Sequence, residues 1–185
     1  MFAKIKTEVS AGEKQIFSGN GEKRKVVGFV IQLDIPGRGT MNLEVLVLDY
    51  NGTLALDGEM FESVKDNLIR LSSFLEIHIL TSDTFGSVGR QCKGLPVQVK
   101  VLESMDHTTE KADYLLQFDS QEIIAIGNGA NDQLMLKRAH LGIAVIGFEG
   151  ASTQTLQSAD LVVNKIEDAF GLLTESQRLN ATLRR

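Results

Sequence analysis

An aspartate stands at the end of an apolar run and is followed by a turn-forming segment. The run 45–48 stops at Asp49, and Asn51, Gly52 and Thr53 come soon after it. A buried parallel strand presents its last residue at the carboxyl edge of a sheet, where α/β proteins bind their ligands. A carboxylate there can act as a nucleophile, and we expect the N–H groups of residues 50–53, Gly52 included, to surround an anion. The alternative is an ordinary turn aspartate, because Asp-x-Asn-Gly is common turn chemistry.

Polar residues follow later elements of the chain in the same way. Thr81 ends a second apolar run and precedes Ser82, Lys111 begins a helix, and Asp132 ends a glycine-rich loop. Loops at the carboxyl ends of parallel strands converge, so we expect these side chains to lie near Asp49. Two carboxylates, hydroxyls and an ammonium group are what phosphoryl transfer uses: carboxylates hold Mg²⁺, and lysine neutralises the phosphoryl oxygens.

The elements that must position these residues alternate between strand and helix. After a strand over 26–35 and a Pro-Gly turn, we expect strands at 43–48, 76–80, 97–102, 122–126, 141–146 and 161–164, and helices at 59–73, 84–91, 108–118, 131–139 and 166–179. This order predicts one doubly wound α/β domain over residues 26–185, a parallel sheet with helices on both faces. Residues 1–25 are polar and weakly patterned, and predict either a small hairpin or a loose extension of unknown role.

Composition narrows the class of protein. The chain has 185 residues, 43% of them apolar and 23% charged, which suits one globular domain with a sizeable core. We find no apolar run long enough to cross a membrane and no signal-peptide pattern. The single cysteine, Cys92, excludes an internal disulfide, so we expect a cytoplasmic protein without membrane insertion. A net charge of −5 without a basic stripe disfavours a nucleic-acid partner.

Four segments, in order along the chain, resemble the motifs of the haloacid dehalogenase superfamily of aspartyl-phosphate phosphatases, and in particular the soluble relatives of P-type ATPase phosphorylation domains. They are Asp49–Thr53, Thr81, Lys111 and Gly127–Asp132. The resemblance covers roughly residues 40–175. It implies a three-layer Rossmann-like fold, phosphorylation of Asp49, a phosphoryl group held by Thr81 and Lys111, and Mg²⁺ as cofactor.

Two positions depart from the hydrolase pattern. Asn51 stands where such phosphatases carry an aspartate that protonates the leaving group, and an amide cannot do this. Asn128 replaces the usual Mg²⁺-ligating aspartate, and an amide oxygen binds a hard cation less strongly. The resemblance therefore implies a metal held by Asp49, the Asn51 carbonyl and Asp132 with help from Asn128, and a hydrolase slowed by about 10²–10⁴-fold. The alternative is an attenuated phosphate-binding regulatory or interaction module.

The spacing of the motifs leaves no room for a cap domain. Only a turn, one helix and one strand fit between Thr53 and Thr81, and only a short helix and a strand fit between Thr81 and Lys111. Superfamily members without a cap domain resemble enzymes whose active site is open to solvent. The expected partner is therefore a phosphorylated small molecule or a phosphoprotein. Cover from a second subunit of a homo-oligomer, or from residues 1–40, is a further hypothesis.

Each candidate residue also has a structural alternative. Asp132 could instead be a residue at a helix N-terminus, and Thr81 could be a helix cap. Lys111 could be a solvated helix lysine, in which case Lys100 would take its role in the site. Ser82 and its neighbour Asp83 fit a loop or capping role as well as phosphate binding. The four motifs taken together favour the catalytic interpretation.

Overall fold

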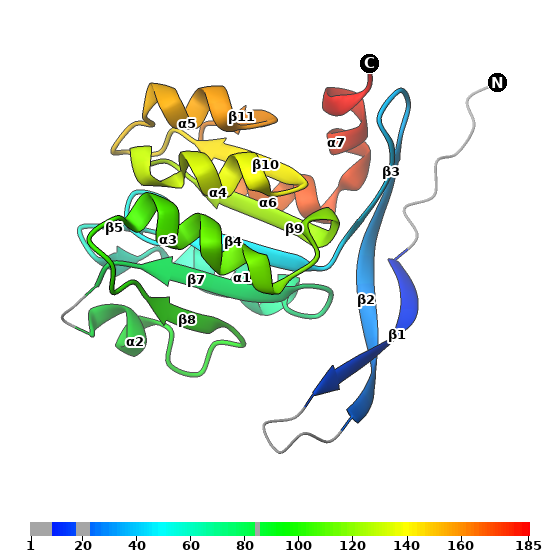
Figure 1. Ribbon diagram of the computed structural model, residues 1–185, viewed down its shortest axis with the longest axis horizontal. Helices are drawn as coiled ribbons and strands as arrows, with labels where there is room; N and C mark the ends of the chain where they lie inside the picture. Colours follow the sequence, from blue (N-terminus) through cyan, green and yellow to red (C-terminus); the bar gives the residue numbers. More distant parts are fainter. Residues whose placement is uncertain (1–8, 18–22, 84–85) are drawn as a thin grey trace.

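The computed structural model describes residues 9–17, 23–83 and 86–185, and its body is a six-stranded sheet between helices (Figure 1). The strand order is β11-β10-β9-β4-β7-β8, and every neighbouring pair runs parallel. The strands are β4 (Val45–Asp49), β7 (Glu76–Thr81), β8 (Gln98–Val101), β9 (Ile123–Gly127), β10 (Leu141–Val145) and β11 (Leu161–Val163). This confirms the predicted doubly wound parallel sheet.

Helices cover both faces of this sheet. On one face α3 packs on α4 and α4 on α5, and on the other face α1 packs on α6 (Figure 1). The helices are α1 (Glu62–Leu71), α2 (Ser87–Gln91), α3 (His107–Tyr114), α4 (Gln133–Arg138), α5 (Thr153–Ser158), α6 (Ile166–Thr174) and α7 (Ser176–Leu183), with 3₁₀ turns at Leu115–Gln117, Ser120–Glu122 and Ala130–Asp132.

The central strand β4 shows why the sheet lies in the middle layer. All five of its residues are buried, as expected of a parallel strand covered on both faces. Leu46 and Leu48 belong to the apolar cluster that includes Val64 and Leu68 of α1, whereas Val45 and Val47 belong to a second cluster with Met135 and Leu136 of α4. Alternate side chains thus anchor the two helical layers, and the strand end is fixed from both sides.

A second, antiparallel sheet stands beside this body (Figure 1). It has the order β1-β2-β3, from β1 (Val9–Phe17), β2 (Lys23–Ile35) and β3 (Gly39–Leu43). β1 pairs with β2, which runs across the boundary expected at residue 25, so residues 9–17 form a strand of this sheet; residues 1–8 and 18–22 lie outside the described part. The buried side chains of β2 join the same apolar cluster as Leu179 and Leu183 of α7.

Several expected elements differ from the observed ones. Glu59–Met60 are not helical but form β6, which pairs with β5 (Ala55–Leu56) as a small hairpin. The strand expected at 43–48 is interrupted at Glu44, between β3 and β4. Helix α5 was not expected, and the helix expected at 166–179 is two helices, because Glu175 leaves the helical conformation (φ −117°, ψ 66°). Leu116, near the end of the helix expected at 108–118, is 69% exposed, because the chain tightens into a 3₁₀ turn there.

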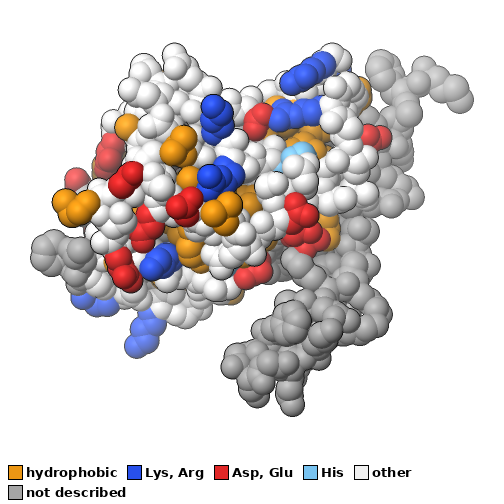
Figure 2. Space-filling view, in the orientation of Figure 1, with side chains coloured by type: hydrophobic (Ala, Val, Ile, Leu, Met, Phe, Trp, Pro, Cys, Tyr) orange, Lys and Arg blue, Asp and Glu red, His pale blue; other side chains and the backbone are white. Residues whose placement is uncertain are grey.

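The described residues contain no separate cap domain, as expected; the β5–β6 hairpin is the insertion that follows Asp49. No helix in the described part of the chain is long and apolar enough to cross a bilayer. On the face over α3, α4 and α5, acidic and basic side chains are interspersed with a few apolar ones (Figure 2).

Candidate active site

The candidate residues gather where the order of the strands reverses. β4 lies between β7 and β9, and the chain crosses from one side of β4 to the other between β8 and β9. Asp49 ends β4, Thr81 ends β7, and Asn128 follows β9 directly. Because parallel strands bring their carboxyl ends to one edge, this reversal opens the crevice in which α/β sheets bind ligands.

Lys111 joins two carboxylates from different loops. Its Nζ lies 2.5 Å from Asp49 Oδ1 and 2.6 Å from Asp132 Oδ1. Lys111 is 1% exposed and Asp132 0% exposed, whereas Asp49 keeps 8% of its surface accessible. A lysine so deeply buried needs such partners, since an unpaired charge in the interior is costly. Of the three charged groups, Asp49 is therefore the one that a ligand can reach.

Asp132 is held by backbone as well as by Lys111. Its Oδ2 accepts hydrogen bonds from the N–H groups of Asn128 (2.9 Å) and Gly129 (2.8 Å). A Cβ at Gly127 would lie 2.4 Å from the same oxygen, so only glycine lets the strand end approach this closely. Both carboxylate oxygens of Asp132 thus have donors, and Asp132 fixes the loop and Lys111 together.

Burial and neighbouring charges shift the ionisation of this cluster. Burial raises the pKa of the Asp132 carboxyl to about 6, and the Asp49 carboxylate adds to the rise, while Lys111 opposes it. Burial disfavours the charged form of Lys111, but the Asp49 and Asp132 carboxylates outweigh it and raise the pKa of the ammonium. Lys111 therefore carries a fixed positive charge beside Asp49.

Asn128 connects three loops through its side-chain amide. Its Oδ1 accepts from Thr53 Oγ1 (3.2 Å), and its Nδ2 donates to the carbonyl of Gly150 (3.0 Å). The Thr53 hydroxyl also lies 3.1 Å from Asp49 Oδ2, and having one proton it donates to one of these oxygens at a time. The loop after β9 is thereby tied to the turn after β4 and to the loop before α5.

Two backbone N–H groups of the turn after Asp49 form hydrogen bonds within the turn itself. The N–H of Gly52 donates to the carbonyl of Ala55 (2.9 Å), and that of Thr53 donates to the carbonyl of Tyr50 (3.3 Å). Gly52 has φ +76°, and a Cβ there would lie 2.4 Å from Asn128 Nδ2, so the position requires glycine. The N–H groups of Gly52 and Thr53 therefore have carbonyl partners within the turn, and the anion-binding role expected of them stays a prediction.

Tyr50 and Asn51 flank the same turn on opposite sides. Tyr50 is fully buried, and its hydroxyl donates to the carbonyl of Gly58 (3.1 Å), which fixes the β5–β6 hairpin beside Asp49. Burial raises the pKa of Tyr50 to about 12, so this hydroxyl stays protonated. Asn51 is exposed at the turn. Its side chain therefore faces solvent.

The remaining candidates separate into buried and exposed groups. Thr81 is buried, and its Oγ1 accepts from the N–H of Asp83 (3.1 Å). Asp83 Oδ2 accepts from Ser87 Oγ (2.8 Å) and from the N–H of Val88 (2.7 Å), so Asp83 holds the start of α2, as its capping alternative states. Ser82 is exposed in the loop between them. Lys100, the substitute for Lys111, instead pairs with Glu103 (3.4 Å).

The donor atoms around Asp49 suit a hard cation, though few of them are charged. Asp49 Oδ2, Asn128 Oδ1 and the Asn51 carbonyl belong to adjoining turns and are oxygens of the kind that Mg²⁺ prefers. Among the described residues, no three His, Cys, Asp or Glu side chains form a group that could hold a metal. The residues fit Mg²⁺ in ligand type, with a weaker charge than a set of carboxylates.

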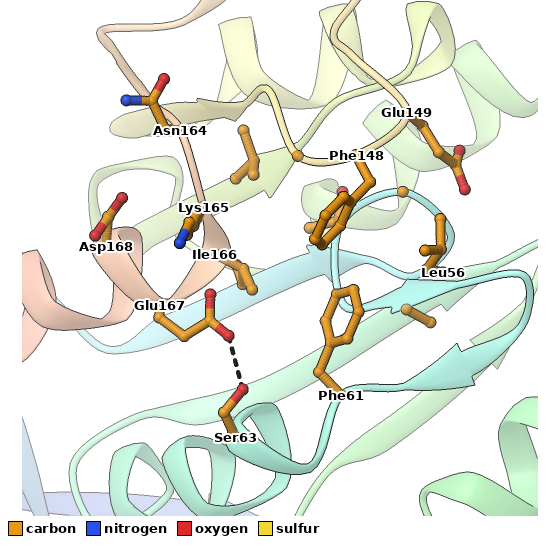
Figure 3. Close-up of a pocket in the computed structure, with 15 residues that line it drawn as sticks. Leu56, Phe61, Ser63, Phe148, Glu149, Asn164, Lys165, Ile166, Glu167 and Asp168 are labelled. Atoms are coloured by element: carbon orange, nitrogen blue, oxygen red, sulfur yellow. Dashed lines mark hydrogen bonds between the residues drawn. The ribbon is translucent and has the colours of Figure 1, made fainter.

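A separate cavity of about 500 Å³ adjoins this cluster (Figure 3). Gly52 and Thr53 form part of its wall, whereas Asp49, Thr81, Lys111 and Asp132 do not line it. The cavity is therefore a neighbour of the Asp49 cluster rather than the space in front of the Asp49 carboxylate.

Comparison with known proteins defines the class. Residues 106–174 match the sequence model of the haloacid dehalogenase-like hydrolases. An uncharacterized protein of Methanocaldococcus jannaschii is 57% identical over 65 residues, which are 35% of this chain and 70% of that protein. The cadmium, zinc and cobalt-transporting ATPase of Bacillus subtilis is 25% identical over 192 residues, 97% of this chain but 26% of the transporter.

Solved structures share the fold. A cobalt-bound deoxy-D-mannose-octulosonate 8-phosphate phosphatase from Haemophilus influenzae has a TM-score of 0.61 at 12% identity, covering 77% of this chain and 94% of that one. The 3-deoxy-D-manno-octulosonate 8-phosphate phosphatase from Moraxella catarrhalis, in complex with magnesium, phosphate and the KDO molecule, has a TM-score of 0.58 at 18% identity, covering 75% and 90%. Residues 106–174 thus match the haloacid dehalogenase-like hydrolases, and the chain has the fold of phosphatases of that superfamily.

Some residues of the cluster escaped the sequence analysis. Thr53 was part of a recognised motif but had no assigned contact with Asp49. Thr155 is fully buried, and its hydroxyl donates to the carbonyl of Gly129 (2.5 Å), which supports the loop that carries Asp132. The spacing Ser152-x-x-Thr155 at a helix start was the available signal, since Ser152 caps α5 by accepting from the N–H of Thr155 (3.2 Å).

Proposed function

We propose that the protein is a phosphatase that transfers a phosphoryl group from a small phosphate ester to Asp49, with Mg²⁺ as cofactor and with slow turnover. The contact that carries this proposal is the 2.5 Å bond between Lys111 Nζ and Asp49 Oδ1. It places a permanent cation beside the most accessible carboxylate of a buried charged cluster. Such an arrangement orients a nucleophile and neutralises charge on an incoming phosphoryl group.

The two chemical steps follow from these groups. One carboxylate oxygen of Asp49 attacks phosphorus while the bond from phosphorus to the ester oxygen breaks, and the other carboxylate oxygen would be left for the metal. Water supplies the proton to the leaving oxygen, since the Asn51 amide has none to give. A second water then attacks phosphorus, which returns the Asp49 carboxylate and releases inorganic phosphate.

The proposed metal ligands are Asp49, the Asn51 carbonyl and Asn128 Oδ1. Asp132 would complete the set; both its oxygens accept hydrogen bonds within the cluster, so it would also hold the ligands in place. The bound ion would neutralise phosphoryl oxygens. Similar solved structures hold cobalt in one case and magnesium in another, which supports a divalent cation.

Thr81 is the proposed hydroxyl for the phosphoryl group, with Ser82 beside it in the same loop. Thr81 lies one residue beyond the partner of Asp49 in the β4–β7 register, Leu80. The open edge of the sheet suits a phosphorylated small molecule, as in the similar phosphatases. Cover by a second copy of the chain remains part of the proposal, tested by its molar mass in solution.

The hydrogen bonds of Asn128 support a second candidate function. The Asn128 amide donates to the Gly150 carbonyl, and its oxygen lies within hydrogen-bond distance of the Thr53 hydroxyl, as in a structural clamp rather than an open metal ligand. This favours a phosphate-binding regulatory module with little turnover.

The two functions are separated by hydrolysis of 4-nitrophenyl phosphate with Mg²⁺, with Asp49→Asn and EDTA as controls. The phosphatase proposal expects slow turnover that requires both Asp49 and the metal. Binding of inorganic phosphate without turnover above Asp49→Asn would favour the regulatory module.

A further inference from the structure

The cavity beside the Asp49 turn has the size and lining of a small-molecule site. Its volume is about 500 Å³, within the range of about 300–1,000 Å³ typical of ligand pockets. Two regions of the chain form it: the turn after β4 with the start of α1, and the loop after β10 with the start of α6. The cavity is therefore lined from both regions and is partly open to solvent.

An aromatic pair forms one wall. The rings of Phe61 and Phe148 are 6.0 Å apart between centroids and tilted by 52°, and both point into the cavity (Figure 3). Phe148 is 80% exposed although it sits on this wall. A phenylalanine this exposed, held against a second ring, leaves apolar area that a flat apolar ligand would cover favourably.

The charged side chains that line the cavity carry a net negative charge, which disfavours binding of an anionic ligand. Three carboxylates, of Glu149, Glu167 and Asp168, outnumber the single cation among the described lining residues, Lys165. Glu167 accepts a hydrogen bond from the neutral Ser63 hydroxyl (2.7 Å; Figure 3), which leaves its negative charge in place. Glu167 and Asp168 also occupy the first turn of α6 and satisfy its dipole, so this helix start offers no anion site.

We propose that this cavity is a second ligand site, which binds an uncharged or cationic aromatic small molecule. The site needs no phosphoryl chemistry, and its lining shares Thr53 with the Asp49 cluster but not Asp49 or Lys111. Its ligand would nevertheless touch Gly52 and Thr53, and the Thr53 hydroxyl lies 3.1 Å from Asp49 Oδ2. A ligand bound in the cavity would therefore contact the turn that follows Asp49, the nucleophile of the proposed function.

Two matched fluorescent probes test the selectivity. N-phenyl-1-naphthylamine is neutral, and 1-anilinonaphthalene-8-sulfonate is the same ring system with one sulfonate. The chain has no tryptophan, so the protein does not interfere by energy transfer to the naphthyl group. We expect saturable one-to-one binding of the neutral probe and binding of the sulfonate weaker by about tenfold or more, since like charges repel in a partly enclosed site. Equal binding of the two probes, or no saturable binding, overturns the proposal.

Variants place the probe in the cavity. Phe148→Ala should weaken the neutral probe by about tenfold, the loss expected on removing an aromatic wall, while Leu116→Ala, an exposed residue away from the cavity, should leave binding unchanged. The double variant E149Q/E167Q should strengthen binding of the sulfonate and not of the neutral probe. An unchanged affinity in Phe148→Ala, or no gain for the sulfonate in the double variant, contradicts the proposal.

A further variant separates this site from the proposed phosphatase activity. Asp49→Asn should abolish turnover and leave binding of the neutral probe intact, because Asp49 does not line the cavity. Probe binding without any wild-type turnover would reject the phosphatase alone. Turnover without probe binding would reject the second site alone.

Discussion

The side-chain amide of Asn128 donates to the carbonyl of Gly150 at 3.0 Å, a bond that an aspartate at this position could not make. Asn128 is therefore more than a weakened metal ligand. It ties the loop after β9 to the loop before α5, and through Thr53 it reaches the turn that carries Asp49. The amide of Asn128 joins these loops, but it lacks the negative charge that an aspartate would place near the proposed metal.

Asn128→Asp should make stability depend on metal. Without metal, the new carboxylate faces the Gly150 carbonyl and lies near Asp132, so we expect a loss of about 1–3 kcal/mol in the free energy of unfolding. Added Mg²⁺ should recover it, because a ligand that binds the folded state stabilises it. Urea unfolding in EDTA and in Mg²⁺ measures both effects. Asn131→Asp in the same loop is the control, and equal stability of Asn128→Asp in the two buffers would count against Asn128 as a metal ligand.

Asn51→Asp should raise turnover. The residue is exposed at the turn, so a carboxyl group is tolerated there and can protonate the leaving oxygen. The expected gain in kcat is about 10²–10⁴-fold, the usual contribution of general acid–base catalysis. Steady-state hydrolysis of 4-nitrophenyl phosphate gives the number. The gain must vanish in the double variant Asp49→Asn/Asn51→Asp; if it persists, the added activity does not pass through Asp49.

Lys111→Met should destabilise the fold strongly. It leaves the carboxylates of Asp49 and Asp132 together without their cation, and breaking a buried ion pair in this way costs about 3–5 kcal/mol. Lys100→Met is the matched control, since its exposed pair with Glu103 is worth about 0–1 kcal/mol. Chemical denaturation of both variants compares them directly. Similar losses in the two would mean that the buried pairing contributes little.

The buried thiol of Cys92 should make the stability of the fold decrease at high pH. Burial raises the pKa of its thiol to about 11, above its ordinary value of 9.0. The unfolded thiol ionises first, so the stability that the neutral thiol contributes is complete below pH 9 and is lost as pH rises towards 11. The stability of the wild type should therefore fall more than that of Cys92→Ala over this interval. At pH 8 a thiol reagent should label the native protein far more slowly than the unfolded one, and equal rates would show an accessible thiolate.

The sequence was most informative where one local signal decides the structure. The short apolar runs ending at Asp49 and Thr81 predict buried strands, and the motif spacing predicts that Lys111 and Asp132 belong with Asp49, as their contacts now show. The strands of the main sheet lie close to their expected ranges, since parallel strands covered on both faces need continuous apolar runs.

Features set by tertiary pairing could not be predicted in this way. The β5 and β6 strands have two residues each, too few for a recognisable period, and the Tyr50 hydroxyl helps to hold their hairpin. The bonds of Asn128 to Thr53 and Gly150 join residues far apart along the chain. Leu116 follows the helical period of its neighbours, yet the 3₁₀ turn rotates it outward.

Formation of a phosphoryl-aspartate at Asp49 is the most direct test of the account. The protein is mixed with 4-nitrophenyl phosphate and Mg²⁺, quenched in acid and weighed intact by mass spectrometry, with Asp49→Asn in parallel. Because Asn51 cannot assist breakdown of the intermediate, we expect a wild-type species heavier by one phosphoryl group, mapped to the peptide that contains Asp49 and missing in EDTA and in the variant. Turnover with no such species, or with the phosphoryl group on another residue, would contradict phosphoryl transfer through Asp49.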